Sequence, residues 1–477
     1  MKKIFTFVSA AVLALSLQAA ELDTIQVDGI YYQINKEDSI ATLIRLNNKF
    51  VYEIDEVEIP VDVEKDDVKY PVVALGQGAF CKTTASKITF AEGSKVTELG
   101  MQTFQAAINV EEIELPEGIK VIPLTCFNNA TAATPTKTKS LTFPASLDSM
   151  AINSVTLPQL EFLEFKGVLP PKMAIKETTW KQNAWMISAT HANNTAKTAV
   201  VLVPKAAVEA YKATPEIGDY FTTILAVKDT IEENGLFFEL DNRTKTATLI
   251  QAQNAAKKYE QESIVIPVSV TKDDIEYPVV ELGRRAFNNS TATSITFAEG
   301  SQVTILGQQS FQAAVELLEL ELPEGVKIIP TSGIHNSTKT NPMKMKKLVF
   351  PASLDSLCVI SIALPQLETL EFKGAVPPSI ATKETATWTQ NPWQISTTNP
   401  CNTNKEAVVI VPDGSLEAYQ NTAWIGDYFT TIIEKKDAPT AIDEVNTDVK
   451  TSKTLRDGQI IILRGGQAFT LTGQEIR

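Results

Sequence analysis

A long passage of this sequence occurs twice, and this duplication constrains the fold more than any other feature. FPASLDSMAINSVTLPQLEFLEFKG at residues 143–167 returns as FPASLDSLCVISIALPQLETLEFKG at residues 350–374, with 18 of 25 letters unchanged. Three further pairs of segments match at offsets of 206 to 208 residues: 28–44 with 234–250, 66–80 with 273–287, and 217–224 with 425–432. The nearly constant offset indicates a tandem duplication of a whole domain. We therefore expect two similar bodies in series.

Each copy contains a finer repeat of short segments rich in β-branched and aromatic residues. These are ITF (88–90), IEL (113–115), LTF (141–143) and LEF (163–165) in the first copy, and ITF (295–297), LEL (320–322), LVF (348–350) and LEF (370–372) in the second. Apolar and polar positions alternate in them, which predicts short strands. One strand in each repeat of about 20–29 residues is typical of a leucine-rich-repeat solenoid, whose rungs bury their apolar faces by stacking on one another.

A pair of residues, one small and one large and apolar, precedes the first three strands of each copy. The pairs are Ala79-Phe80, Thr103-Phe104, Cys126-Phe127, Ala286-Phe287, Ser310-Phe311 and Gly333-Ile334. We expect the small residue to let the backbone approach closely on the convex side. The large residue then fills the space between the strand and the returning turn.

These motifs resemble the BspA-like, or Treponema-type, leucine-rich repeats of bacterial surface proteins, including those of Bacteroidetes. The resemblance is carried by VVALGQGAF, ITFAEGSKVTELGMQTF and VEEIELPEGIKVIPLTCF and extends over about residues 28–435. It implies a mainly β fold with short helical or turn returns, forming two tandem leucine-rich-repeat solenoid domains. Each domain would begin with a small N-terminal β region and end in a strand and helix marked by Pro204 with Tyr211 and by Pro412 with Tyr419. The rungs are degenerate and only Cys81 follows an Ala-Phe pair, so the number of rungs stays open.

The resemblance also implies a function. We expect a secreted or cell-surface protein that recognises macromolecules through its exposed solenoid face, with adhesion to a host or bacterial protein or glycan as the leading role. The alternative is a structural or scaffold component of the cell envelope without a specific ligand.

The ends of the chain differ from the repeats. Lys2 and Lys3, an apolar run over 4–17 and two small residues at 19–20 predict a secretory signal peptide at 1–20. We further predict the first β region and repeat domain at 21–227, a joint at 228–234, the second β region and repeat domain at 235–435, a linker at 436–453 and a C-terminal β hairpin tail at 454–477. No stretch after the signal has the roughly 20 apolar residues of a spanning helix, so we expect no transmembrane segment.

The tail TLRDGQIIILRGGQAFTLTGQEIR alternates apolar positions across Asp457-Gly458 and Gly465-Gly466, which predicts short strands joined by tight turns. It resembles the C-terminal segments of secreted Bacteroidetes proteins, some of which the type IX secretion system recognises. Secretion machinery is therefore one candidate partner of the tail. A capping hairpin without a sorting role is the alternative.

The charge of the chain bears on its partners. The formal net charge is −14, and it becomes −16 without Lys2 and Lys3. An excess of acidic residues repels phosphate backbones and anionic lipid, so we expect no nucleic-acid partner.

The sequence contains few of the residues and motifs that are typical of catalytic sites. It has two histidines, His191 and His335, and the corresponding residues of the other copy are Asn399 and Asn128. Since both lie in segments rich in Asn and Thr, we predict surface-loop histidines. Known nucleophile, zinc-protease and nucleotide-binding motifs are absent from the sequence, so we expect no enzyme, no catalytic or metal-binding residues and no cofactor. A glycan hydrolase that uses carboxylates alone is the remaining enzymatic alternative.

The four cysteines are too few for a disulfide framework. Cys126 occupies the small-residue position of a repeat, which predicts a buried thiol. Two rungs at ~4.8 Å each separate it from Cys81, beyond the reach of a disulfide. A bridge between Cys358 and Cys401 stays open.

Four of the five tryptophans fall in one duplicated segment, TTWKQNAWMIS (178–188) and ATWTQNPWQIS (386–396). Trp180, Trp185, Trp388 and Trp393 are therefore candidate ligand contacts, since aromatic side chains in a long loop can form a stacking platform. The alternative, which we favour, is a cap that covers the core of the last rung.

Five short motifs resemble the acceptor of O-glycosylation in Bacteroidetes, an Asp followed by Ser or Thr and an apolar residue. They begin at Asp23, Asp38, Asp148, Asp229 and Asp355. Because Asp-Ser also favours turns, a purely structural role is the alternative.

Overall fold

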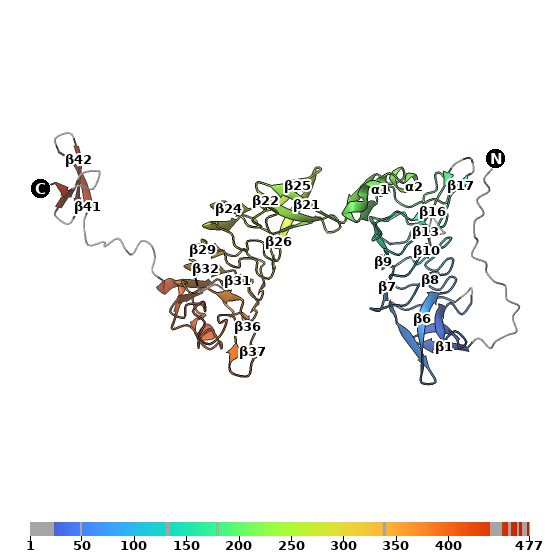
Figure 1. Ribbon diagram of the computed structural model, residues 1–477, viewed down its shortest axis with the longest axis horizontal. Coiled ribbons are helices and arrows are strands. Elements are labelled where there is room, and N and C mark those ends of the chain that lie inside the picture. The colour runs from blue at the N-terminus through green and yellow to red at the C-terminus, as the bar shows by residue number, and fades with distance from the viewer. Residues whose placement is uncertain are drawn as a thin grey trace. The chain divides into compact units, whose positions relative to one another are not determined.

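The chain folds as two compact units. The structure is a computed structural model that describes residues 23–47, 50–129, 134–177, 179, 181–336, 340–438, 451–456, 459–464, 467–469 and 475–476. Unit 1 comprises Met1–Thr230 with Leu240–Lys245, and unit 2 comprises Ile231–Glu239 with Thr246–Arg477. Short strands stacked on one another dominate both units (Figure 1). The predicted fold class, mainly β with two tandem leucine-rich-repeat solenoids, is confirmed.

A six-stranded sheet opens each copy of the repeat. In the first copy its order is β1-β2-β3-β6-β5, with β8 paired to β6, and the second copy repeats this order as β21-β22-β23-β26-β25, with β28 paired to β26. The strands are β1 (Asp23–Val27), β2 (Ile30–Asn35), β3 (Ile40–Ile44), β5 (Asp62–Lys65), β6 (Val68–Leu75) and β8 (Glu98–Leu99), then β21 (Lys228–Glu233), β22 (Leu236–Asp241), β23 (Thr246–Leu249), β25 (Ser269–Lys272), β26 (Ile275–Leu282) and β28 (Ile305–Leu306). The segment predicted as the joint, 228–234, thus contains β21, the first strand of the second sheet.

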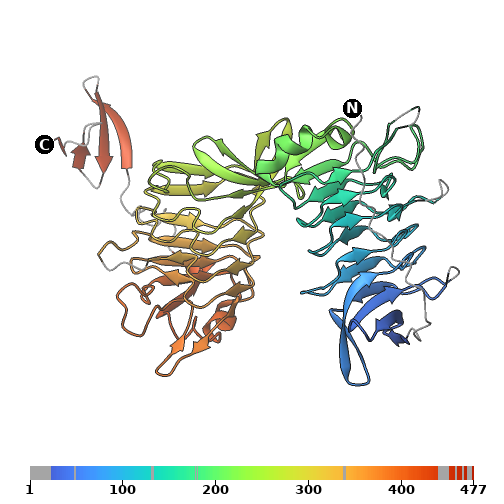
Figure 2. The same cartoon turned by 45° about the vertical axis from the view of Figure 1, so that its right-hand side comes forward.

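Parallel strands, one from each rung, form the main ladder of each solenoid (Figure 2). In the first copy they are β4 (Glu56–Ile59) with β7 (Lys87–Phe90), followed by β9 (Glu112–Glu114), β12 (Ser140–Phe143), β15 (Phe162–Phe165), β19 (Val200–Val203) and β20 (Thr223–Ala226). In the second they are β24 (Ser263–Ile266), β27 (Ser294–Phe297), β29 (Glu319–Glu321), β32 (Lys347–Phe350), β35 (Thr369–Phe372), β39 (Val408–Val411) and β40 (Thr431–Glu434). All eight triplets identified in the sequence lie in or overlap these strands.

Strands of two residues line the other sides of the rungs. In the first copy they are β10 (Val121–Ile122), β13 (Ser149–Met150) and β16 (Lys172–Met173), β11 (Phe127–Asn128) and β14 (Val155–Thr156), and β17 (Lys176–Glu177) and β18 (Lys181–Gln182). In the second they are β30 (Ile328–Ile329), β33 (Ser356–Leu357) and β36 (Ser379–Ile380), β31 (Ile334–His335) and β34 (Ile362–Ala363), and β37 (Lys383–Glu384) and β38 (Thr389–Gln390).

The predicted strand and helical turn lie near the end of each copy, and one further strand of the ladder follows them, β20 in the first copy and β40 in the second. After β19 come η1 (Lys205–Ala207), α1 (Val208–Lys212) and α2 (Pro215–Gly218), and after β39 comes α3 (Leu416–Gln420), with η2 (Lys435–Asp437) following β40. The buried Tyr211 hydroxyl donates to the carbonyl oxygens of Gly167 or Leu169, both 3.1 Å away. Tyr419 repeats the bond to Gly374 at 2.7 Å. Each tyrosine therefore fixes the helix to the turn that follows the LEFKG strand.

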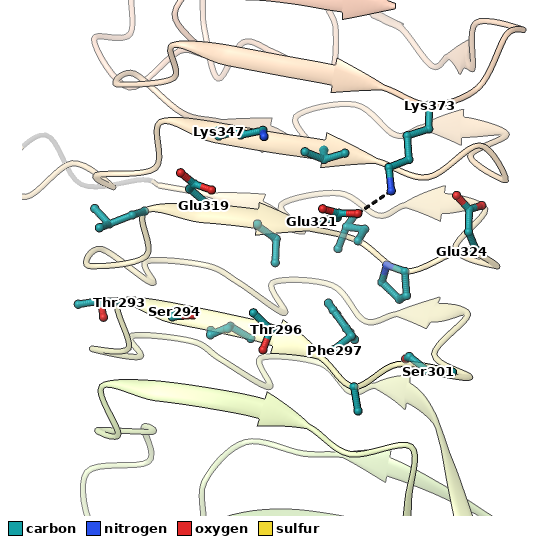
Figure 3. A pocket seen from close by; sticks show the side chains of 18 residues that line it. Thr293, Ser294, Thr296, Phe297, Ser301, Glu319, Glu321, Glu324, Lys347 and Lys373 are labelled. Carbon is teal, nitrogen blue, oxygen red and sulfur yellow. Dashed lines mark hydrogen bonds and ion pairs between the residues drawn. The ribbon is translucent and has the colours of Figure 1, made fainter. Parts of the chain in front are cut away.

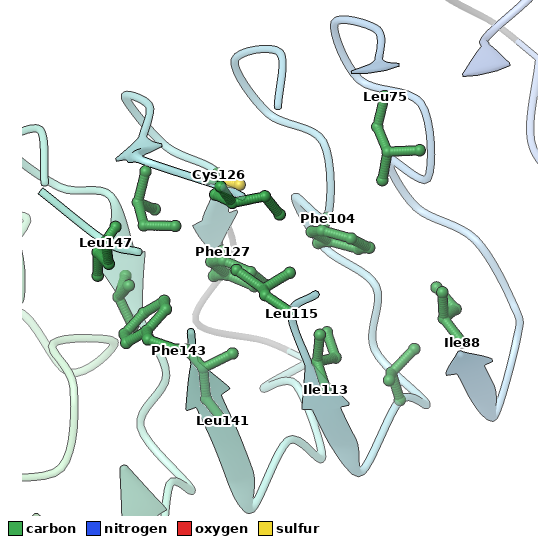
Figure 4. Close-up of a cluster of buried hydrophobic side chains, with 14 of the residues drawn as sticks. Leu75, Ile88, Phe104, Ile113, Leu115, Cys126, Phe127, Leu141, Phe143 and Leu147 are labelled. Atoms are coloured by element: carbon green, nitrogen blue, oxygen red, sulfur yellow. The ribbon is translucent and has the colours of Figure 1, made fainter. Parts of the chain in front are cut away.

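The large residues of the small-large pairs form the core. Phe80, Phe104 and Phe127 are at most 2% exposed, and successive rings are stacked at centroid distances of 5.8 and 5.0 Å. Figure 4 shows the rings of Phe104 and Phe127 lying parallel to one another among the buried side chains of the rungs. In the second copy Phe287 and Phe311 are stacked at 5.4 Å, and Ile334 takes the third place. Cys126 is fully buried in its small-residue position, which confirms that prediction.

The C-terminal segment contains β41 (Thr451–Arg456), β42 (Gln459–Arg464), β43 (Gln467–Phe469) and β44 (Glu475–Ile476), in that order in one antiparallel sheet. The predicted signal peptide, residues 439–450 of the predicted linker, and the tail's two predicted turns at 457–458 and 465–466 lie outside the described residues. Within the described part of the chain, no helix has the length and apolarity needed to cross a membrane.

Candidate binding surface

The outer face of the parallel ladder, which points away from the core, carries the exposed charged residues of the strands. In β9 the side chain of Ile113 is buried, whereas Glu112 and Glu114 on either side of it are exposed. In β29 Leu320 is buried between the exposed Glu319 and Glu321. This alternation follows from the period of two along a strand. It places two carboxylates of one strand on the same outer face.

The ladder of the second copy opens between β27 and β29. These strands share a single residue pair, Ser294 with Glu319, whereas β32 and β35 pair at four positions from Lys347 to Phe350. Leu318 N–H donates to Thr293 O at 3.3 Å at the closed end. The gap therefore lies toward the carboxyl ends of the two strands.

A groove occupies this gap, which we call the unit 2 groove (Figure 3). It has a volume of about 780 Å³ and is lined by residues 293–298, 300–301, 318–324, Lys347, Val349 and Lys373. Glu321 and Lys373 form an ion pair of 2.5 Å at its edge, as the dashed line in Figure 3 marks. The groove thus combines apolar side chains of the rung with charged side chains of the outer face.

The first copy has a groove at the corresponding place, the unit 1 groove. Among the described strands of the main ladder, β7 pairs with β4 and β9 pairs with β12, so the ladder is interrupted between β7 and β9. The groove has a volume of about 910 Å³ and is lined by Glu56, residues 86–91, 93–94, 109, 111–112 and 114–117, and Lys166. Lys166 forms an ion pair of 2.5 Å with Glu114, equivalent to Lys373 with Glu321. Both the opening and its charged pair therefore recur in the duplicated domain.

The carboxylates of the two grooves differ in how they are engaged. Glu117 accepts hydrogen bonds from the backbone N–H groups of Ala145 and Ser146 at 3.0 and 3.2 Å. Glu324 does the same in the second copy, at 3.1 and 3.3 Å. These two glutamates therefore support the neighbouring turns.

Glu112 and Glu319 occupy equivalent positions but have different neighbours. Within unit 1, Arg243 Nη1 lies 3.5 Å from a carboxylate oxygen of Glu112. Among the ion pairs of the described residues, Glu319 has no cation within 4.0 Å. The unit 2 groove thus offers the more available carboxylate.

The tryptophans proposed as ligand contacts occupy different environments. Trp185 and Trp393 are fully buried. Their indole N–H groups donate to the carbonyl oxygens of Glu216 at 2.8 Å and Trp424 at 2.6 Å. Their rings lie 5.1 Å from those of Phe221 and Phe429. In this structure a ligand cannot stack on either ring, and both have the position that the capping alternative requires.

The structure does not test the predicted ligand contact at the other two tryptophans of the segment, Trp180 and Trp388. Trp388 is partly exposed, and its carbonyl oxygen accepts a hydrogen bond from the Thr385 backbone N–H at 3.0 Å. Ligand contact at Trp388 stays a prediction. Trp180 lies outside the described residues.

The prediction of a surface-loop histidine is wrong for His335. The residue lies in β31, it is 5% exposed, and neither ring nitrogen has a hydrogen-bond partner. Burial lowers the pKa of the imidazole from 6.5 to about 4. Its counterpart Asn128 is also buried, at 6% exposure in β11. His191, by contrast, is partly exposed and its Nδ1 accepts a hydrogen bond from the Asn193 N–H at 3.0 Å.

The four cysteines all lie in the described part of the chain and form no disulfide there, so Cys358 and Cys401 are not bridged. Among the described residues, His, Cys, Asp and Glu side chains do not gather into a group that could hold a metal ion. In the candidate glycosylation motifs, Thr24, Ser39 and Thr230 are exposed, while Ser149 and Ser356 are partly buried. Modification at these positions stays a prediction.

Sequence reasoning placed the binding surface on the exposed solenoid face but did not find the grooves. The segments KITF and EIE predict strands equally well, and nothing local indicates that the two strands separate. The only available signal was the pair of glutamates two residues apart, Glu112 with Glu114 and Glu319 with Glu321, kept in both copies.

Comparison with known proteins supports the assignment of the repeats. Residues 62–167 and 260–364 match the family model described as a BspA type leucine rich repeat region, in six copies. No curated protein sequence matches the chain.

Several solved structures resemble the chain at low identity. A leucine-rich repeat protein from Bacteroides capillosus is 24% identical, with 30% of this chain and 99% of that chain covered and a TM-score of 0.26. A leucine rich cell surface protein from Faecalibacterium prausnitzii is 12% identical, with 74% and 95% covered and a TM-score of 0.20. The pneumococcal vaccine antigen PcpA is 16% identical, with 87% and 99% covered and a TM-score of 0.25. Residues 62–167 and 260–364 of this chain are therefore BspA-type leucine-rich repeats.

Proposed function

We propose that this chain is a secreted or surface-displayed recognition protein, which binds a macromolecule through the outer face of its parallel ladders. One observation carries the proposal: the two copies have grooves of about 910 and 780 Å³ at equivalent places on that face. Openings of this size fit part of a ligand, and the flat sheet around them can contact a larger partner. The signal-like residues 1–20 support export.

The finer assignment within this proposal is adhesion. A solenoid offers an extended surface with little need for conformational change, and two copies in one chain can engage two sites of one partner. Such bivalence raises the overall affinity through effective concentration when both sites can be reached. The partner is a protein or a glycan, and the C-terminal tail is proposed to address the secretion machinery. The protein acts by binding, without a catalytic step.

The test is a binding screen with the full mature chain against host and bacterial proteins and glycans, read by surface plasmon resonance. The double variant Thr89→Arg with Thr296→Arg places a large charge at the centre of both grooves. We expect its affinity for the partner to fall at least tenfold. The matched control, Val121→Arg with Ile328→Arg, changes exposed residues on the neighbouring ladder and should bind as the wild type does.

Two results would count against this function. If no saturable partner is found while the protein remains abundant in the cell envelope, the structural alternative is favoured. If the Val121 and Ile328 variant loses binding and the Thr89 and Thr296 variant does not, the recognition surface lies on the other ladder.

A further inference from the structure

We infer that each groove binds an extended peptide with lysine or arginine at alternate positions, which adds its backbone to the open edge of the ladder. This inference rests on the proposed function and names the chemistry of the partner. It is carried by three features of the seam between the strands: the orientation of the backbone groups, the closure of the rungs on the opposite side, and the spacing of the carboxylates.

The backbone groups at the seam are those that a ladder would use. In a parallel sheet, alternate residues of a strand direct their N–H and C=O groups to opposite neighbours. Ala298 N–H donates to Ile266 O, and Leu322 N–H donates to Val349 O, both at 3.0 Å and both away from the seam. The alternate residues Phe297 and Glu321 therefore direct their backbone groups toward the groove. An added strand can pair with such groups, which is the principle of β-augmentation.

The same two rungs are joined on the side of the small-large pairs. Phe287 N–H donates to Ser310 O at 2.7 Å, and Asn289 N–H donates to Gln312 O at 3.0 Å. The first copy has the same two bonds, from the Phe80 N–H to Thr103 O and from the Lys82 N–H to Gln105 O, both at 2.8 Å. The rungs are thus held together on one side and separated on the other. This makes the groove part of the fold in both copies.

The carboxylates select the side chains of the occupant. Glu319 and Glu321 lie two residues apart on one strand, which corresponds to a spacing of about 6.7 Å. Side chains at alternate positions of an extended peptide have the same spacing, so a Lys-x-Lys or Arg-x-Arg segment can match both carboxylates. Glu112 and Glu114 repeat the arrangement. Lys373 pairs with Glu321 and leaves Glu319 without an ion pair among the described residues, whereas in the first copy Lys166 pairs with Glu114 and Arg243 with Glu112.

The test uses the full mature chain and a fluorescent ten-residue peptide in which lysine alternates with threonine. Its control replaces every lysine by glutamate. By fluorescence anisotropy at low salt, we expect the lysine peptide to bind at least tenfold more tightly than the glutamate peptide, and to weaken as salt is added. Equal binding of the two peptides, or no binding of the lysine peptide, would overturn the inference.

Matched variants locate the site. The quadruple variant Glu112→Gln, Glu114→Gln, Glu319→Gln and Glu321→Gln should bind the lysine peptide at least tenfold more weakly. The control, Glu161→Gln with Glu368→Gln, removes equivalent carboxylates of the two copies that lie outside the grooves and pair with Lys139 and Lys346. It should bind within twofold of the wild type. An equal loss in both variants would show non-specific attraction and reject the site.

Hydrogen exchange of the wild type provides a readout that does not depend on the folding of variants. Peptide binding should slow the exchange of the Phe297 and Glu321 amides, and unchanged exchange at both would reject strand addition. The binding experiments also distinguish the peptide inference from the proposed recognition function. A partner from the screen that still binds the quadruple variant, or a linear glycan that binds where the peptide does not, rejects the peptide and leaves the recognition function standing. Absence of any saturable partner rejects the function itself.

Discussion

His335 shows how one residue can distinguish two copies of the same fold. Its imidazole lies inside a rung, where Asn128 lies in the other copy, and both ring nitrogens lack partners. Burial of an ionisable group without a partner favours its neutral form. The folded protein therefore holds the pKa of His335 at about 4, against the ordinary value of 6.5.

This pKa makes the stability of unit 2 depend on pH. Between pH 4 and 6.5 the unfolded chain binds a proton at His335 that the folded chain does not, so folding loses stability as the pH falls. Above pH 6.5 His335 is neutral in both states, so it does not lower the unfolding free energy of unit 2. As the pH falls toward 4 this free energy decreases by a total of about 3 kcal/mol. We predict that His335→Asn, which installs the residue of the first copy, removes this part of the acid sensitivity. The measurement is urea unfolding of unit 2 at pH 7.5 and pH 4.5.

The control for this prediction is His191→Asn, which lies in unit 1 and also takes the residue of the other copy. It should leave the pH dependence of unit 2 as in the wild type. An equal loss of stability between pH 7.5 and 4.5 in wild type and His335→Asn would show that the imidazole is not the source.

At the scale of the elements, the rungs stack closely because glycine occupies one position in each copy. Gly100 follows β8, and a Cβ atom there would lie 2.4 Å from the backbone nitrogen of Gln77 in the preceding rung. Gly307 has the same relation to Arg284, also at 2.4 Å. Backbone atoms cannot move away as a flexible side chain can, so any larger residue must push the rungs apart.

We predict that Gly100→Ala destabilises unit 1 by roughly 1–3 kcal/mol, the usual range for overpacking. The control is Gly167→Ala, because a Cβ atom there meets its nearest neighbours at an ordinary 3.4 Å. Chemical denaturation of both variants gives the comparison. Similar unfolding free energies for the two would contradict the close-packing argument.

The elements also show which parts of the fold can be predicted from sequence. Strands such as β12 and β15 are predictable because four residues suffice to show alternation between β-branched, aromatic and polar side chains. Strands of two residues, such as β31, are too short for any period, and for this reason the burial of His335 was missed. The grooves were missed for another reason: they depend on how two strands diverge, which involves rungs about 25 residues apart.

At the scale of the whole molecule, the duplication yields two units that each have a core of their own. The unit 1 core runs from Ile30 to Ile224 as one continuous cluster of buried residues. The second copy repeats the positions in order, from Leu236 to Phe429. In a solenoid each rung is stabilised mainly by its nearest neighbours. A destabilising substitution in one unit should therefore lower the stability of that unit and not of the other.

Independent unfolding of unit 1 and unit 2 can be tested in the full chain by removing one core ring from each unit. Phe104 is stacked between Phe80 and Phe127, and Phe104→Ala leaves a cavity that should cost unit 1 about 3–5 kcal/mol. Phe311→Ala should lower the unfolding free energy of unit 2 by an amount at the lower end of that range. The reason is that Phe311 is stacked on Phe287 but has Ile334 in place of a third ring. Hydrogen exchange followed by mass spectrometry across a urea series reports each unit separately. Each variant should shift the transition of its own unit alone. A joint shift of both transitions would mean that the two units unfold as one cooperative body.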